Sequence, residues 1–518
     1  MMRALMVLAP LPALAVALMV LGGAPIALDL PALRMSLTLD MPGAMLLGVA
    51  ALLWSAAGLY AAANGTANGN GARFGVCWLL TLVGSLGVFV AADLLTFYLV
   101  FALVSLPAWG LVIHDEDAPA WRAGGIYMAF TVLSEALLLL GFVLLAVGEP
   151  NGSVQISDVV AALPNSPWRM PALLFTGAGF ALKIGLVPAH GWMPLSYAAA
   201  PIPAAAALSG AGVKAGVIGL IRFLPFDDAA SMQGAGEVLV VLGLFSAFYG
   251  VALGLTQSNP KTVLAYSSVS QMGVIATVLG MGLVAPEGGG GTALAASFYA
   301  AHHVLAKGAL FLAVGVIALT PANRAGPTLI LAAIPALGLG GLPLSGGALA
   351  KLAVKAPLGD GLVDSLANLS AAGTTLLMVH FLIRLVGTAA RESPTPLPRG
   401  LTLPWRTLAV ASVVVPWLLY AVVMGPLADA LAPKVLFASL WPAAVGVALA
   451  LALRRWGDRL PLMPAGDIVG AIERAFRASF SLGAAMDWAD GRLRQWPAAC
   501  LSLLAVAAAL GATILFGG

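Results

Sequence analysis

The sequence contains seven lysines, and five lie inside or at the edge of long apolar segments: Lys183, Lys214, Lys307, Lys351 and Lys355. On insertion scales a lysine near the bilayer centre costs about 2.5–3.5 kcal/mol, so five are hard to retain without a use. A desolvated lysine can lose its proton, whereas arginine keeps its charge. The row therefore indicates passage or gating of protons. The alternative, preferred for Lys355, is that the stem lies in lipid and the amine reaches the interface.

Glu135 is the one charged residue in the apolar segment 127–147. A carboxylic acid in this position is either protonated and packed between helices or paired with a buried amine. The second arrangement is favourable because a carboxylate and an amine each stabilise the charged form of the other. We expect it here, with Lys183 or Lys214 as the partner.

Three histidines and an arginine occur at helical spacings within apolar segments. His303 and Lys307 are four residues apart and share one helix face, whereas His302 points about 100° away. His302 either packs in the core or takes part in a relay. His380 and Arg384 form a second pair at the same spacing, and Arg384 is close enough to a segment end to mark the membrane interface.

Composition identifies the elements that must position these side chains. The chain has 518 residues, of which 61% are hydrophobic and 9% charged, and its net charge is +3. Soluble domains carry about 25% charged residues, so a soluble globular protein is excluded, and nothing indicates a nucleic-acid partner. The two cysteines provide no ligand set for an iron–sulfur cluster or zinc finger, and no Walker loop or HExxH helix is present. We expect no cofactor and no metal bound by this chain.

A bilayer core of about 30 Å requires roughly 20 apolar residues per helix. The chain is therefore expected to be an all-α polytopic membrane protein with about 14–15 transmembrane helices. The expected spans lie near residues 5–22, 41–63, 75–92, 94–113, 124–147, 171–190, 201–223, 238–255, 263–283, 293–319, 328–357, 365–386, 403–424, 435–453 and 497–516.

Two of these spans are interrupted beside a lysine. Residues 185–194 read GLVPAHGWMP next to Lys183, and residues 338–347 read GLGGLPLSGG just before Lys351. Unwound backbone at membrane depth is tolerated only where protein buries it or where it lines a wet cavity. Paired interruptions in two halves of a chain are typical of inverted repeats with an ion path between them. The alternative for either one is an ordinary proline kink.

Four motifs in one order resemble the signatures of a known family. They are the segment 183–223 (KIGLVPAHGWMP to IRF), NPKTVLAYSSVSQMGVI at 259–275, HHVLAKGALFLAVG at 302–315 and GLPLSGGALAK at 341–351. The chain resembles, over about residues 41–384, the antiporter-like membrane subunits of respiratory complex I, membrane-bound hydrogenases and multi-subunit cation/proton antiporters. The resemblance implies two inverted five-helix repeats, each with a broken helix, and a hydrated file of buried charges. It also implies proton movement coupled to a redox module or exchanged for sodium.

The resemblance assigns roles by position. Lys183 matches the lysine of the first broken helix and Lys214 the lysine that follows it. His303 and Lys307 match the connecting pair, and Lys351 matches the lysine of the second broken helix, where some members have glutamate.

One position here departs from the family pattern, and one further element matches it in a structural role. The family's usual glutamate, which pairs with the first broken-helix lysine, is replaced by Ala102. We hypothesise that Glu135 on the next helix has taken over the pairing with Lys183. His190 and Trp192 match a His–x–Trp element, for which we expect packing or hydrogen bonding within the loop.

We interpret the chain as a proton-translocating, antiporter-like subunit of a multi-subunit complex in a bacterial inner membrane. The expected division is N-terminal helices in 1–93, one repeat in 94–223, a second in 236–390, and C-terminal helices in 400–518 with an interfacial segment near 466–496. Other membrane subunits and a soluble redox or zinc-containing module are the expected partners. This chain has no cofactor ligands, so any redox chemistry would lie in those partners. With them, the chain would be a subunit of a proton-pumping enzyme of the NADH:quinone oxidoreductase or hydrogenase type.

Three alternatives remain open at this point. The first is a subunit of a multi-subunit sodium/proton antiporter, which shares every motif. The second is the proton-conducting partner of an inorganic-carbon-hydrating protein. The third is a membrane-embedded enzyme such as a lipid-linked transferase, for which the acidic loop 114–117 (HDED) is the one candidate site.

Overall fold

The computed structural model describes residues 2–65, 71–226, 232–284, 289–390, 397–455 and 461–475. The chain divides into a large compact unit, Met1–Ala465, and a small unit, Gly466–Gly518. Most of the expected interfacial segment, at 476–496, and the expected last span, 497–516, lie outside the described residues. The fold below is that of the large unit.

Eleven helical segments in the described part are long and apolar enough to cross a membrane. They are Met2–Leu21 (α1, Met2–Leu8, and α2, Leu11–Leu21), α3 (Met41–Ala63), Leu94–Val112 (α5, Leu94–Ser105, and α6, Ala108–Val112), α7 (Ala118–Gly148), Ile202–Phe223 (α11, Ile202–Ala207, and α12, Lys214–Phe223), α13 (Gln233–Leu255), α14 (Pro260–Val284), α15 (Gly289–Ala318), α18 (Leu362–Val386), α19 (Arg399–Val423) and α21 (Pro433–Arg454). An integral membrane protein with many helical spans is thus confirmed. Backbone groups in lipid must bond within their own segment, which is why apolar sequence of this length forms helices.

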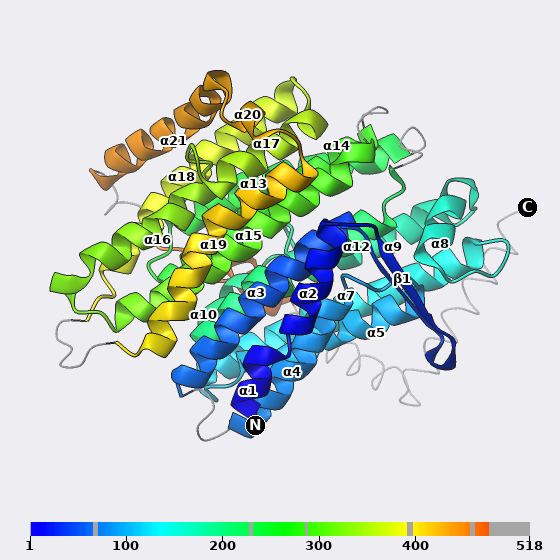
Figure 1. Cartoon of the computed structure of the whole chain (residues 1–518), viewed down its shortest axis with the longest axis horizontal. Coiled ribbons are helices and arrows are strands. Elements are labelled where there is room, and N and C mark those ends of the chain that lie inside the picture. Colours follow the sequence, from blue (N-terminus) through cyan, green and yellow to red (C-terminus); the bar gives the residue numbers. More distant parts are fainter. Residues whose placement is uncertain are drawn as a thin grey trace, which may run out of the picture. The chain divides into compact units, whose positions relative to one another are not determined.

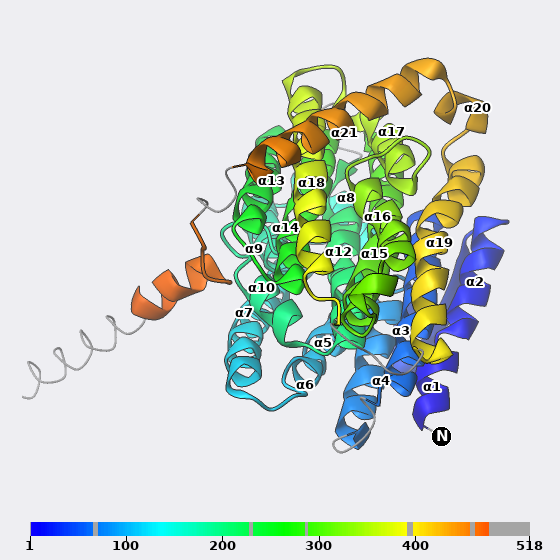
Figure 2. The ribbon, with the colours of Figure 1, turned by 90° about the vertical axis from the view of Figure 1, so that its left-hand side faces the viewer.

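Five further helical segments lie between or beside these spans. They are α4 (Gly71–Gly87), α8 (Ile156–Ala162), the pair α9 (Arg169–Ile184) and α10 (Trp192–Ala199), the pair α16 (Gly326–Leu339) and α17 (Gly346–Leu358), and α20 (Leu427–Ala430). Each pair is one interrupted helix. The expected span 328–357 covers both parts of the second pair, whereas the expected span 171–190 covers α9 and the break but ends before α10. Most long helices run side by side along one direction, and α21 crosses α18 obliquely (Figures 1 and 2).

A β-hairpin near the N-terminus departs from the all-α expectation. Its strands β1 (Ile26–Leu30) and β2 (Met35–Leu39) pair antiparallel between α2 and α3. Asp93 fastens the hairpin to the helix bundle, because its carboxylate accepts from the Ser36 amide at 2.8 Å and from the Thr96 amide at 2.8 Å. The hairpin is a connection between spans and leaves the helical architecture of the membrane part unchanged.

Small residues bring α13 and α14 into backbone contact. A Cβ added at Gly243 would lie 2.6 Å from the Gly273 carbonyl oxygen, and one added at Gly273 would lie 2.5 Å from the Gly243 carbonyl oxygen. Gly236 on α13 and Gly280 on α14 make the same close contact two helical turns away. Without a hydrophobic force between helices in lipid, such close packing is a main source of their association.

Replacing Gly273 with valine should therefore separate α13 from α14. We expect Gly273→Val to lower the free energy of unfolding by about 1–3 kcal/mol, the usual cost of overpacking. Thermal unfolding of the purified chain in detergent measures the loss. Gly125→Val is the control, since a Cβ at Gly125 meets nothing within 4 Å. Equal melting temperatures for the two variants would contradict the packing described here.

Candidate functional site

The first helix interruption lies between α9 and α10. Gly185 ends α9 with a φ of +71°, a left-handed conformation that glycine adopts at no steric cost. Two polar groups at this break are hydrogen-bonded within the chain: Trp192 Nε1 donates to the Leu182 carbonyl at 3.0 Å, and the Val187 amide donates to Ser246 Oγ at 3.0 Å. His190 is fully buried, and its ring packs edge-on against Tyr249 at 5.1 Å between centroids. The break is thus enclosed by side chains of this chain.

Lys183 lies in the last turn of α9, immediately before this break, and is buried. Its Nζ donates to Ser105 Oγ at 2.6 Å and lies 5.3 Å from the centre of the Phe101 ring. Ser105 is three residues beyond Ala102 on α5. A hydroxyl on the helix that carries the glutamate in the family is therefore the direct partner of Lys183, which sequence reasoning missed.

Glu135 on α7 is buried, and its Oε1 has no hydrogen-bond partner among the described residues. Among the described residues, Glu135 and Lys183 do not form an ion pair within 4.0 Å. Each side chain nevertheless lies in the electrostatic field of the other. Two cavities of about 10 Å³ adjoin the amine, both lined by Tyr127, Lys183 and Trp192. That volume is roughly the space of one water molecule. The proposed pairing of Glu135 with Lys183 remains a prediction.

Lys214 and His303 are in direct contact at the centre of the bundle. Lys214 begins α12 after a π-helical turn over Leu208–Gly212, and its Nζ lies 2.8 Å from His303 Nδ1 on α15. Neither side chain is exposed to any extent. A protonated lysine has no acceptor and a protonated imidazole has none either. A hydrogen bond between the two therefore requires that at least one of them is neutral.

Lys307, one helical turn beyond His303, is also fully buried. Its Nζ donates to the Leu264 carbonyl oxygen on α14 at 2.7 Å. His302 faces the second interrupted helix instead, since a Cβ added at Gly346 would lie 2.7 Å from His302 Cδ2. The adjacent histidines thus face two different parts of the site.

The second interruption separates α16 from α17. Gly341 has a φ of +85° and Leu344 a φ of +64°, both in the left-handed region. The Ser345 side chain caps the N-terminus of α17 by accepting from the Ala348 amide. Lys351 on α17 reaches back across the gap, and its Nζ donates to the Gly340 carbonyl oxygen. As at Lys183, a lysine and an unwound backbone segment form one unit.

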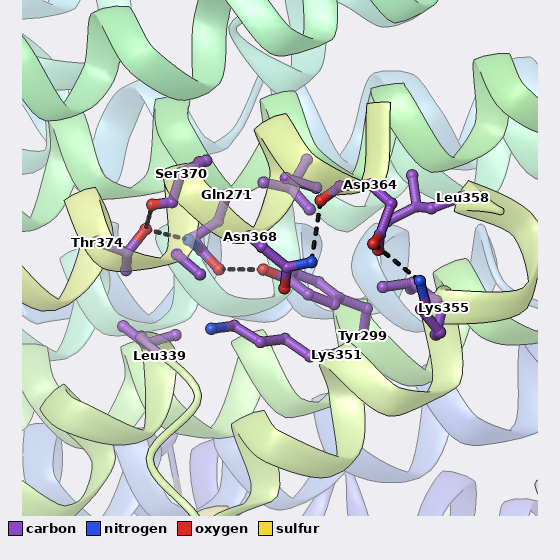
Figure 3. A pocket seen from close by; sticks show the side chains of 14 residues that line it. Gln271, Tyr299, Leu339, Lys351, Lys355, Leu358, Asp364, Asn368, Ser370 and Thr374 are labelled. Atoms are coloured by element: carbon purple, nitrogen blue, oxygen red, sulfur yellow. Dashed lines mark hydrogen bonds and ion pairs between the residues drawn. The ribbon is translucent and has the colours of Figure 1, made fainter. Parts of the chain in front are cut away.

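A cavity of about 50 Å³ adjoins Lys351 and contains a chain of uncharged polar side chains (Figure 3). Tyr299 Oη donates to Gln271 Oε1 at 2.7 Å, and Gln271 Nε2 donates to Thr374 Oγ1 at 3.1 Å. All three are buried. Sequence reasoning missed them, although Gln271 lies within one of the four motifs and an amide inside an apolar span is itself a signal.

Lys355 lies at the outer end of the same cavity. Its Nζ forms ion pairs with Asp360 at 2.7 Å and with Asp364 at 2.8 Å, and 45% of its side chain is exposed. The amine therefore reaches the surface, as the alternative of an interfacial lysine requires. The cavity extends from the half-buried Lys351 towards this exposed cluster (Figure 3).

His380 and Arg384 lie elsewhere in the bundle. His380 Nε2 is 2.9 Å from the Gln257 carbonyl oxygen. His380 and Arg384 line a separate cavity of about 190 Å³ together with parts of α13 and α21. The acidic loop 114–117 is engaged in local contacts: Arg73 pairs with Glu116 at 2.5 Å, and Asp117 caps α7 by accepting from the Ala120 amide at 2.7 Å. The described residues contain no group of three His, Cys, Asp or Glu side chains placed to hold a metal ion.

Comparison with known proteins places the chain in a family context. Residues 91–356 match the family model described as NADH:quinone oxidoreductase/Mrp antiporter, transmembrane region. Hydrogenase-4 component B of Escherichia coli (strain K12) is 32% identical over 231 residues, which are 43% of this chain and 34% of that protein. The chain thus aligns with about a third of the length of this relative.

Two solved structures share the fold over most of its length. One is the Mrp complex from Dietzia sp. DQ12-45-1b, with a TM-score of 0.67, 21% identity and coverage of 87% of this chain and 92% of that one. The other is an archaeal respiratory membrane complex, the membrane-bound sulfane sulfur reductase, with a TM-score of 0.69, 20% identity and coverage of 86% and 94%.

The burial described above predicts which lysines a reagent can reach. In the folded chain, a water-soluble amine-acylating reagent should modify Lys355 and Lys434, which are exposed, and spare Lys214 and Lys307, which are not. Mass spectrometry of digested peptides measures the modified fraction of each. Protein unfolded in dodecyl sulfate serves as the control in which all four react. Comparable labelling of Lys214 and Lys355 in the folded chain would contradict the burial.

Proposed function

The chain belongs to the NADH:quinone oxidoreductase/Mrp antiporter transmembrane family, and we propose that it moves protons across a membrane along its buried lysines and histidine. The observation that carries the proposal is the 2.8 Å contact between Lys214 Nζ and His303 Nδ1. At least one member of this pair must be neutral, and a neutral nitrogen has a lone pair. That nitrogen can therefore accept a proton from the other member of the pair when the other is protonated. Proton transfer between the two groups needs no movement of either helix.

In the proposed path, the first half lies around Lys183. A proton that reaches Lys183 passes by way of the small adjoining cavities towards Lys214, and a change of charge on Glu135 alters how strongly Lys183 holds its proton. The Ser105 hydroxyl accepts a hydrogen bond from the Lys183 amine. Because a hydroxyl can both donate and accept a hydrogen bond, it can also take part in the path beside Lys183. Glu135 acts through the electric field at Lys183, since the two groups form no direct ion pair.

The second half of the path connects the centre to the opposite surface. From the Lys214–His303 pair the proton passes to Lys307 and on to Lys351. Tyr299, Gln271 and Thr374 provide the continuation, because their side chains are already hydrogen-bonded in series beside Lys351. Lys355 and its two aspartates mark the exit. His302, His380 and Arg384 are secondary to this path, and His190 supports the first helix break.

The two broken helices support the division into repeats. We propose that residues 94–223 and 236–390 are inverted five-helix repeats, with α9–α10 and α16–α17 in corresponding positions. Residues 1–93 and 400–518 then flank them. Counting each broken helix and α4 as spans brings the large unit close to the 14–15 spans expected from the sequence.

The charges at the two ends of the bundle support an orientation. Consecutive spans run in opposite directions, so the loop between α6 and α7 shares a face with the loop between α18 and α19. On this face lie the basic side chains of Arg73, Arg122, Lys261, Arg324, Arg384 and Arg399, together with the acidic side chains of Asp115, Glu116 and Asp117. On the opposite face the acidic side chains outnumber the basic ones: the acidic residues include Asp29, Asp40, Asp93, Glu149, Asp158, Asp360, Asp364 and Asp429, and the basic residues are Arg34, Arg169, Arg222, Lys355 and Lys434. By the positive-inside rule the basic face is cytoplasmic, and the exit at Asp364 faces away from the cytoplasm.

We further propose that the chain is one subunit of a multi-subunit complex in a bacterial inner membrane. Protons moving without a partner would dissipate the membrane gradient, so a redox module or a second ion must drive the path. Similarity to hydrogenase-4 component B supports a redox partner, whereas similarity to a chain of the Mrp complex supports exchange for another cation. Dependence of proton movement on sodium distinguishes the two.

Removing either of two buried lysines should stop proton movement. We expect Lys183→Ala and Lys214→Ala each to lower proton flux at least tenfold, because each removes a group that must carry the proton. A pH-sensitive dye in vesicles containing the assembled complex measures the flux. Lys434→Ala, which removes an exposed lysine, is the control and should leave flux unchanged. Normal flux in both buried-lysine variants, with the complex assembled, would contradict the proposed path.

Variants at Glu135 and Ser105 separate the two partners of Lys183. We expect Glu135→Gln to reduce proton flux at every pH, because the charge that modulates Lys183 is lost. Ser105→Ala removes one hydrogen bond and should reduce flux less than Glu135→Gln. The flux assay described for the lysines measures both variants. Unchanged flux in Glu135→Gln would show that Glu135 has not taken over the role of the carboxylate absent at position 102.

A further inference from the structure

The cavity of about 190 Å³ lies where α13, α18 and the end of α21 come together, and its lining includes none of the buried lysines. α18 packs against both of the other helices (Figure 1). Two arginines face the cavity: Arg384 in the last turn of α18 and Arg454 in the last turn of α21. We propose that this cavity binds the phosphate headgroup of an anionic phospholipid.

The two guanidinium groups have no partner in the described part of the chain. Neither Arg384 nor Arg454 forms an ion pair or a side-chain hydrogen bond there. Both side chains are exposed, so a ligand can reach them. Arg73 and Arg222, by contrast, are each paired with a carboxylate. Two unpaired guanidinium groups at one cavity can hold a phosphate through paired N–H donors, which is the geometry that arginine offers best.

The remaining lining suits the first part of an acyl chain. Leu255, Leu376, Ile383, Leu453 and Leu462 form apolar walls beside the arginines. A free phosphate or a soluble anion would gain nothing from these walls. A phospholipid joins a charged group to an apolar chain and contacts both kinds of lining at once, which favours it over a soluble anion.

The cavity is also preformed by hydrogen bonds around its rim. Gln257 Nε2 donates to the Met463 carbonyl oxygen at 3.1 Å and so fastens the segment that carries Leu462 to the end of α13. His380 on α18 donates a hydrogen bond from Nε2 to the Gln257 carbonyl oxygen at 2.9 Å. A site whose walls are already fixed loses less conformational freedom when a ligand binds.

The position of the cavity agrees with an anionic ligand. Arg384 belongs to the basic face assigned above to the cytoplasm, and anionic lipids of that leaflet are attracted by basic groups at the ends of spans. An acidic segment of a partner protein is the other possible occupant. It would match the arginines but not the row of leucine and isoleucine walls.

Thermal unfolding of the purified, delipidated full chain tests the proposal. The melting temperature is followed with increasing phosphatidylglycerol, phosphatidylcholine or inorganic phosphate at matched concentrations. A ligand that binds only the folded chain raises the melting temperature. We expect phosphatidylglycerol to raise it at concentrations at least tenfold below those needed with phosphatidylcholine or phosphate. The double variant Arg384→Gln/Arg454→Gln should require at least tenfold more phosphatidylglycerol.

The control is Arg399→Gln/Arg406→Gln, which removes two exposed positive charges from α19 and should respond like the unmodified chain. If the glutamine variant does not fold, Arg384→Lys/Arg454→Lys keeps the charge without the paired donors and should bind with intermediate strength. Equal stabilisation by phosphatidylcholine or by phosphate overturns the proposal. So does an unchanged lipid response in the glutamine variant, which would mean that the arginines only complement the negative C-terminal ends of their helices.

Discussion

The hydrogen bond between Lys214 and His303 places two basic nitrogens 2.8 Å apart where neither side chain is exposed. The pair cannot hold two full charges in that geometry, because a protonated lysine and a protonated imidazole are both donors only. The pair therefore holds at most one positive charge, and either group can carry it. The rest of the structure can be understood as the framework that keeps this pair together, buried and connected to both faces.

Backbone irregularity is what connects the pair to its neighbours. The first break and the π-helical turn each lie within one helical turn of a buried lysine, Lys183 and Lys214, and Lys351 reaches the second break through its side chain. Lys351 donates to the Gly340 carbonyl at the second break, whereas Lys307 donates to the Leu264 carbonyl within the regular helix α14. Carbonyl acceptors stabilise a protonated amine without neutralising it, so the proton remains transferable. A carboxylate at the same distance would hold the proton more tightly.

Much of this could be predicted from the sequence, and the reasons for the exceptions are physical. Lys183, Lys214, Lys307 and Lys351 are charges in apolar segments, so each is visible without a structure. The four motifs identified the family, which the match over residues 91–356 confirms. Most spans were also placed closely, since α3 was expected at 41–63 and is Met41–Ala63.

The residues that sequence reasoning missed are neutral or depend on distant segments. Tyr299, Gln271 and Thr374 carry no charge and come from three helices, so only the fold brings them into one series. Ser105 is one hydroxyl among many, and nothing in its local sequence indicates that Lys183 contacts it. The hairpin was missed because its two five-residue strands are short and lie between apolar helices. Arg384 lies near a segment end and so offered the membrane interface as one interpretation, but that Arg454 lines the same cavity depends on how α21 crosses α18.

The central claim is that the buried groups carry protons because they can become neutral. Lys214→Arg tests it most directly, since arginine keeps a positive charge at the same position and does not release its proton. We expect proton flux in vesicles containing the assembled complex to fall at least tenfold in this variant, while Lys434→Arg at the surface leaves it unchanged. Flux in Lys214→Arg equal to that of the unmodified complex would contradict the account, because a permanently charged group would then serve as well as lysine.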